Sequence, residues 1–219
     1  IVLAIGARRM AKRNAIVREF TSTETLGAVS TIITDKTGTL TKNALTVRKL
    51  FIPDELEAGA DFEVTGEGWS PEGTIIRKNA IADTNNDVAL QRLLQIAAYC
   101  NNASIRKTAK PDNYELTGDP TEGALAVLAQ KGETAVDDKK KVDDLPFNST
   151  MKLRATIVRE DDGETNLLVV GAPEKILALS TKILHPQGLN PMNPQSANLL
   201  ANKIDDWSAQ TMRVIGLAY

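Results

Sequence analysis

A turn suited to phosphate directly follows an apolar run, and this pair of features constrains the fold more than any other part of the sequence. Residues 29–34 are mostly apolar or β-branched, which predicts a buried strand. The strand ends at Asp35, and open α/β sheets carry their reactive groups at the carboxyl ends of strands. From Asp35 the sequence reads DKTGTLT, with a cation at Lys36, three threonine hydroxyls and a glycine that lets backbone N–H groups turn toward an anion.

A carboxylate in this setting can attack a phosphoryl group and form an aspartyl-phosphate. The alternative is a strand followed by a glycine-containing turn, in which Asp35 serves only as a cap. A lone aspartate and glycine at this spacing would favour the cap. The complete heptapeptide favours Asp35 as a nucleophile.

Composition sets bounds on the class of protein. The 219 residues suffice for one large or two small domains, and 25% charged residues is ordinary for a globular protein. A net charge of -2 gives no indication of nucleic-acid binding. Cys100 is the only cysteine, which excludes an internal disulfide, and its apolar surroundings predict a reduced core residue. No run approaches the roughly 18 to 20 apolar residues that span a bilayer.

Two helices are marked clearly. Residues 87–101 place their leucines on one face, with Asp87 or Asn86 available as a cap. The string TGDPTEGAL opens the second helix, where Asp119 suits the cap and Pro120 the first helical position. Glu122 stands where a side chain returns to the cap, so this local pattern explains it without a ligand.

Strands dominate the stretch that follows. A hairpin turn signal, DDG, separates the last two of three strand-like segments, so we expect an antiparallel sheet. The three segments are residues 142–147, 153–159 and 166–170. The charged run at residues 137–144 reads as a solvated turn before them.

The same stretch carries the strings PFNSTMK and GAPE. By pattern alone Phe147 reads as a core residue, but an aromatic face can also stack on a purine, and Lys152 can approach phosphates. Pro173 suits the first position of a helix, and Gly171 before it lets a ligand approach the backbone.

Several strings together resemble the P-type cation-transporting ATPases. DKTGTLT, extended by Asn43, resembles their phosphorylation motif, and TGDPTEGAL resembles the Gly-Asp-Pro-Thr-Glu motif of the type II pumps. PFNSTMK resembles the adenine-stacking motif, and GAPE resembles a Lys-Gly-Ala-Pro-Glu motif in which Val170 replaces the lysine. The opening string LAIGARRMAKRNAIVR resembles the stalk after the fourth membrane helix of that family.

The resemblance implies an α/β fold in two parts. A haloacid-dehalogenase-like, Rossmannoid phosphorylation domain would be partly present, with an α+β nucleotide-binding domain inserted into it. The inserted domain would have an antiparallel sheet flanked by helices. The implied parts are a stalk and linker at residues 1–26, the first part of the phosphorylation domain at 27–45, the nucleotide-binding domain at 46–212, and a strand returning to the phosphorylation domain at 213–219.

The resemblance also implies roles for single residues. Asp35 would accept the γ-phosphate of ATP beside Lys36 and Thr37, and Asp35 and Thr37 would hold Mg²⁺. In the nucleotide site, Glu122 would face adenine, Phe147 would stack on it, Lys152 and Arg213 would meet the phosphates, and Gly171 would line the cleft. Because the family's lysine lies in that cleft, Val170 predicts weaker ATP binding than in lysine-containing relatives.

The resemblance therefore predicts the ATP-binding and phosphorylation segment of a cation pump, a soluble fragment lying at the cytoplasmic face of a membrane. Its partners would be the actuator and membrane domains and, through the latter, the transported cation, whose identity the sequence does not specify. One alternative is a soluble dehalogenase-like phosphatase or phosphotransferase. Such enzymes commonly carry a second aspartate two residues after the nucleophile, where this chain has Thr37. The other alternative is a nucleotide-binding module that is inactive on its own, since a second aspartate motif for Mg²⁺ is missing from the sequence.

Overall fold

The computed structural model describes residues 2–19, 21–41, 43–53, 59–109 and 114–219. The chain divides into two compact units, Ile1–Asn43 and Ala44–Tyr219, which we describe separately. Among the described residues, no helix is both long and apolar enough to cross a membrane.

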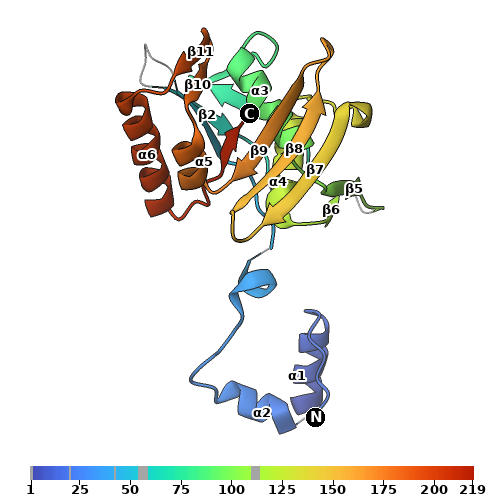
Figure 1. The fold of residues 1–219 in the computed structure, drawn as a ribbon. Helices are drawn as coiled ribbons and strands as arrows, with labels where there is room; N and C mark the ends of the chain where they lie inside the picture. Colours follow the sequence, from blue (N-terminus) through green and yellow to red (C-terminus); the bar gives the residue numbers. More distant parts are fainter. Residues whose placement is uncertain (1, 20, 42, 54–58, 110–113) are drawn as a thin grey trace. The chain divides into compact units, whose positions relative to one another are not determined.

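The first unit consists of short helices joined by extended chain (Figure 1). Its elements are α1 (Val2–Ala11), α2 (Thr21–Gly27) and a single helical turn, η1 (Lys36–Leu40). Helix α1 overlaps the opening string that resembles the stalk, and α2 ends at Gly27.

The prediction of a buried strand at residues 29–34 is wrong. These residues form no strand, and Ile33 leaves 96% of its surface exposed. A strand needs a neighbour to satisfy its backbone hydrogen bonds, and no strand is present among the described residues of the first unit. The open α/β sheet expected around Asp35 is therefore not observed in the described part of the first unit.

The second unit is built from antiparallel strands (Figure 1). One sheet has the order β1-β2-β3-β4, with β1 (Lys49–Ile52), β2 (Ala60–Val64), β3 (Ile75–Arg77) and β4 (Ala80–Ile81). The other has the order β12-β9-β8-β7, with β7 (Lys141–Asn148), β8 (Leu153–Arg159), β9 (Thr165–Gly171) and β12 (Gly216–Ala218). Two hairpins complete the strands: β5 (Ser104–Lys107) with β6 (Tyr114–Thr117), and β10 (Lys182–His185) with β11 (Gly188–Pro191). The mixed helix and antiparallel sheet agree with the α+β domain that the sequence predicts.

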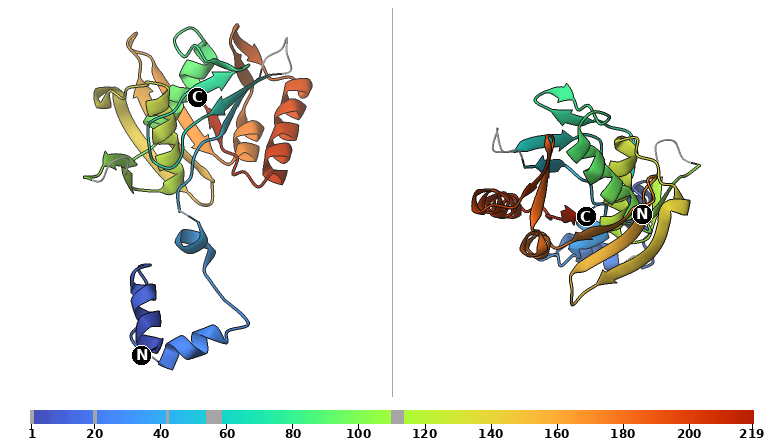
Figure 2. Two further views of the ribbon diagram at one scale, coloured as in Figure 1. Left: turned by 180° about the vertical axis from the view of Figure 1, so that it is seen from behind. Right: turned by 45° about the horizontal axis from the view of Figure 1, so that its top comes forward.

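The helices of this unit cover the sheets. They are α3 (Val88–Tyr99), α4 (Pro120–Lys131), α5 (Pro173–Leu179) and α6 (Pro194–Ala209), with the short turn η2 (Asp138–Lys140) before β7. Helix α3 packs against α4, β9 and β12, and Figure 2 shows α3 and α4 beside the β7–β9 sheet. Asp87 caps α3, as predicted, because its Oδ1 accepts a hydrogen bond from the N–H of Leu90 at 3.0 Å.

The core lies between these helices and the strands. Leu90 and Leu94 on α3 are almost fully buried, as are Val158 on β8 and Leu168 on β9. Cys100 is also fully buried, which confirms the prediction of a core cysteine. Burial raises the pKa of its thiol to about 11, so it is protonated at neutral pH.

Strand β8 alternates between partly and fully buried positions. Arg154, Thr156 and Val158 point to the helix side, because successive side chains in a strand point to opposite faces. Two polar side chains on a buried face need partners, and these partners define the site described next.

Candidate nucleotide-binding site

The carboxyl end of β7 and the turn that joins it to β8 carry two of the predicted nucleotide-binding residues, Phe147 in β7 and Lys152 in the turn (Figure 1). Asn148 orders the turn: its Oδ1 accepts from the N–H of Thr150 and of Met151 at 2.9 and 3.0 Å. Lys152 adopts a left-handed φ of 57° and donates its N–H to the Asn148 carbonyl at 2.7 Å. The Phe147 side chain is 58% exposed, so it is not the core residue that its apolar character alone would predict.

Gly171 lies next to this turn on the neighbouring strand. It pairs with Leu153, the first residue of β8, at the carboxyl end of β9. A Cβ at Gly171 would lie 2.4 Å from the Lys152 carbonyl oxygen, which accepts a hydrogen bond from the N–H of Ala172 at 3.0 Å. A glycine at position 171 therefore allows the Lys152 backbone to pack closely against β9. This packing explains the glycine without the ligand approach that the sequence predicts.

Arg213 lies just before β12, at the same end of the sheet. Gly216, the first residue of β12, pairs with Gly171, and the exposed Arg213 precedes it by three residues. Strand order and register thus place Phe147, Lys152, Gly171 and Arg213 at the same end of this sheet, although Phe147 and Arg213 are 66 positions apart in the sequence.

Glu122 comes to this sheet from α4. Asp119 caps the helix, as predicted, since its Oδ1 accepts from the N–H of Thr121 at 2.7 Å and of Glu122 at 3.2 Å. The Glu122 carboxylate turns to other partners: Oε2 accepts from the N–H of Asn102 at 2.9 Å, and Oε1 pairs with Nη1 of Arg154. Glu122 is thereby tied to β8, two residues after Lys152.

Arg154 and Asp144 complete a polar cluster that sequence reasoning missed. Arg154 is 4% exposed and donates from Nη2 to both Asp144 carboxylate oxygens at 2.9 Å. Asp144 also accepts from Thr156 Oγ1 at 2.7 Å and from Asn102 Nδ2 at 2.9 Å. The interpretation of residues 137–144 as a solvated turn is wrong at Asp144, because this residue lies in β7 opposite Thr156. The available signal was an arginine at an inward position of an alternating strand.

Asp144 makes the second unit sensitive to acid. Burial would raise the pKa of its carboxyl, but hydrogen bonds from Asn102, Thr156 and Arg154, with the arginine's charge, lower it from 3.8 to about 2. A lowered folded-state pKa stabilises the fold above the unfolded value, and this contribution is lost as pH falls toward 2.

Urea denaturation between pH 5 and pH 2 measures this contribution. We expect the difference in unfolding free energy between wild type and Asp144→Asn to shrink by about 2 kcal/mol across this range. Asp138→Asn removes an exposed carboxylate and should show no such change. A constant difference for Asp144→Asn would contradict the assignment of a lowered pKa.

The predicted catalytic residues lie in the other unit. Asp35 is exposed and precedes η1, a single turn closed by a hydrogen bond from the N–H of Thr41 to the Lys36 carbonyl at 3.1 Å. Gly38 has a φ of 76°, and its N–H donates to Thr41 Oγ1 at 3.3 Å. The side chain of Thr37 is outside the described part of the structure. The two groups of predicted residues therefore belong to separate units.

A magnesium ion would find part of its ligand set near Asp35. Mg²⁺ binds through one or two carboxylates together with water and substrate phosphates, and Asp35 is a ligand of that type. No group of three acidic, histidine or cysteine residues that could hold a metal occurs among the described residues. Asp35 thus fits the ion as one ligand of a larger site.

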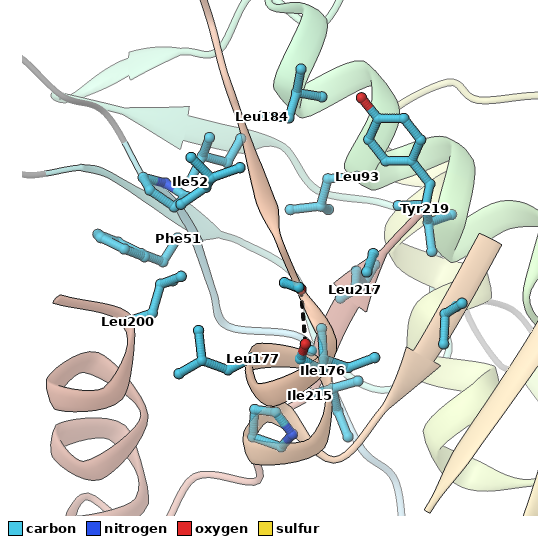
Figure 3. A pocket seen from close by; sticks show the side chains of 18 of the residues that line it. Phe51, Ile52, Leu93, Ile176, Leu177, Leu184, Leu200, Ile215, Leu217 and Tyr219 are labelled. Atoms are coloured by element: carbon cyan, nitrogen blue, oxygen red, sulfur yellow. Dashed lines mark hydrogen bonds between the residues drawn. The ribbon is translucent and has the colours of Figure 1, made fainter. Parts of the chain in front are cut away.

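A cavity of the second unit is lined by other residues than those of the candidate site. It has a volume of about 600 Å³, and Figure 3 shows its mostly apolar lining between β1, β12 and helices α5 and α6. Phe51, Leu177, Leu200 and Leu217 are among its lining residues, whereas Glu122, Phe147, Lys152 and Arg213 are not. An apolar cavity does not match a triphosphate, so the candidate site is the end of the sheet that carries Phe147, Lys152, Gly171 and Arg213.

Comparison with known proteins decides the family. Residues 89–219 match the family model described as P-type ATPase, cytoplasmic domain N. The chain belongs to the P-type ATPase family. The family predicted from the motifs is thereby confirmed, and the matched region contains every residue of the candidate nucleotide site.

Curated P-type ATPases match along the whole chain. A calcium-transporting ATPase of Bacillus subtilis is 31% identical over all of this chain and 24% of its own length. The endoplasmic reticulum calcium ATPase srcA of Aspergillus fumigatus is 34% identical over 99% of the chain and 25% of its own length. The cation-transporting ATPase pma1 of Synechocystis is 32% identical over the whole chain and 24% of its own length. The chain thus spans about a quarter of these relatives.

Proposed function

We propose that the second unit binds ATP as the nucleotide-binding domain of a P-type cation pump. The observation that supports this most is the position of the motif residues Phe147, Lys152, Gly171 and Arg213 at the same end of one sheet. Phe147 offers an exposed ring for the adenine, Glu122 a carboxylate for its amino group, and Lys152 and Arg213 positive charge for the phosphates.

The first unit, in this proposal, supplies the phosphate acceptor. Asp35 attacks the γ-phosphorus of ATP, the bond to the ADP oxygen breaks, and an aspartyl-phosphate forms beside Lys36 and Thr37. Mg²⁺, held in part by Asp35 and Thr37, would neutralise charge on the phosphates when bound. Residues 1–26 serve as stalk and linker, and residues 27–45 as the start of the phosphorylation domain.

The complete pump would couple this phosphorylation to cation transport from the cytoplasmic face of a membrane. Its actuator and membrane domains are the proposed partners of this chain. Calcium is the favoured cation, because two of the relatives above carry calcium in their names. The match to domain N disfavours a soluble phosphatase, and no observation supports that alternative specifically.

Calorimetric titration of the 219-residue chain with ATP tests the proposal. We expect saturable binding at one site, weakened up to about fivefold by Lys152→Gln, because a partly exposed ion pair is worth about 1 kcal/mol at most. Lys139→Gln is the matched control, since Lys139 is exposed at the opposite end of β7. Adenosine, which lacks phosphates, should bind both variants equally. Absence of saturable ATP binding would contradict the proposal.

A further inference from the structure

Val170 and Arg154 are direct neighbours on two adjacent strands. In the register of β8 and β9, Arg154 lies opposite Val170, and the two residues are 4% and 6% exposed. Residues opposite each other in an antiparallel pair share a face of the sheet, with Cβ atoms about 4.5–5.5 Å apart. The position at which the P-type motif carries lysine is therefore beside a buried arginine in this chain.

A lysine at position 170 would conflict with Arg154. Like charges directly opposite each other destabilise a sheet, and a second buried cation would need a further anion. Val170 instead packs in the hydrophobic core. The expectation that position 170 lies in the nucleotide cleft is therefore wrong for this chain, because the side chain is almost fully buried. The positive charge on this face of the sheet comes from Arg154.

The arginine is held in one orientation by two carboxylates. Nη1 pairs with Glu122, and Nη2 pairs with both oxygens of Asp144, a planar fork that lysine cannot reproduce. Nε of Arg154 is buried without a hydrogen-bond partner among the described residues. The orientation of the guanidinium is therefore set by the two carboxylates that its Nη1 and Nη2 contact. The Glu122 carboxylate is consequently clamped between Arg154 and the N–H of Asn102, away from the cap of α4.

We infer that Arg154 is a positioning residue for base recognition: it fixes the Glu122 carboxylate that faces the base and replaces the charge that the family motif places at position 170. This inference rests on the proposed ATP site. A fixed carboxylate accepts a hydrogen bond from the exocyclic amine of adenine and repels the carbonyl oxygen that guanine carries at the same place. Preference for ATP over GTP thus depends on Arg154, although the arginine itself need not touch the nucleotide.

A double-mutant cycle between positions 154 and 170 tests the inference. The variants are Arg154→Gln, Val170→Lys and the two combined, each titrated with ATP and with GTP in the 219-residue chain. Arg154→Gln should reduce the ATP/GTP preference about tenfold, the scale of losing a charged hydrogen bond. Val170→Lys alone should not tighten ATP binding, whereas the double variant should recover part of the lost ATP/GTP preference, because a lysine supplies the charge without the guanidinium fork.

Two further variants separate positioning from folding. Arg159→Gln removes an exposed arginine at the end of the same strand and should leave the preference unchanged. Arg154→Lys keeps the charge without the fork and should recover only part of the preference, even if Arg154→Gln fails to fold. Thermal unfolding measured beside each titration identifies a variant that has lost its structure.

The results that overturn the inference differ from those that overturn the proposed function. Tighter ATP binding by Val170→Lys in the presence of Arg154, or an unchanged ATP/GTP ratio in folded Arg154→Gln or Arg154→Lys, removes the inference and leaves the ATP site intact. Absence of ATP binding by the unaltered chain removes both.

Discussion

Phe147→Ala weakens ATP binding about five- to hundredfold, because stacking of a base on an aromatic ring contributes roughly 1–3 kcal/mol and 1.4 kcal/mol is tenfold. The ring is 58% exposed near the carboxyl end of β7, so its removal opens no cavity in the core. We therefore expect the thermal unfolding midpoint to stay close to that of the wild type while the dissociation constant rises. Calorimetric titration with ATP measures the change.

The matched control for this prediction is Leu179→Ala. Leu179 is also exposed and apolar, but it lines the apolar cavity and not the candidate nucleotide site. Its substitution should leave ATP affinity unchanged. Equal affinities of wild type and Phe147→Ala would refute the stacking role, and a larger loss in Leu179→Ala would move the site to the cavity.

Asp35→Asn abolishes the acid-stable phosphoenzyme in a complete transporter that contains this chain. An amide is not a nucleophile comparable with a carboxylate, so no aspartyl-phosphate can form at this position. Labelling with γ-³²P-ATP, followed by acid quench, measures the phosphoenzyme directly. Asp138→Asn, which alters an exposed carboxylate of the second unit, should leave labelling intact. Persistent labelling of Asp35→Asn would show that another residue accepts the phosphate.

Local sequence patterns predict the second unit well where backbone hydrogen bonds are made by residues close in the sequence. Asp87 and Asp119 cap their helices as expected, because a short carboxylate before a helix has few other partners. The two long strands β8 and β9 and the turn between them also follow from alternation and turn chemistry. Such features depend on residues within a few positions of each other.

Longer-range features were not predictable in the same way. The run at residues 29–34 has strand composition but forms no strand, because composition supplies no pairing partner. Asp144 is part of a charged run, yet its environment is set by Arg154 and Thr156 across the sheet. The resemblance to the Lys-Gly-Ala-Pro-Glu motif predicts that position 170 lies in the cleft, whereas strand register places Val170 beside a buried arginine. Strand register is the information that the sequence lacks here.

We expect ATP to bind at the end of the sheet formed by the carboxyl ends of β7 and β9 and the amino ends of β8 and β12. Two-dimensional ¹H–¹⁵N NMR of the 219-residue chain, titrated with ATP, tests it most directly. We predict saturable shift changes concentrated on the backbone amides of Glu122, Phe147, Lys152, Gly171 and Arg213. Changes concentrated instead on the residues that line the apolar cavity, such as Phe51, Leu177 and Leu217, would contradict the claim, as would a spectrum that ATP leaves unchanged.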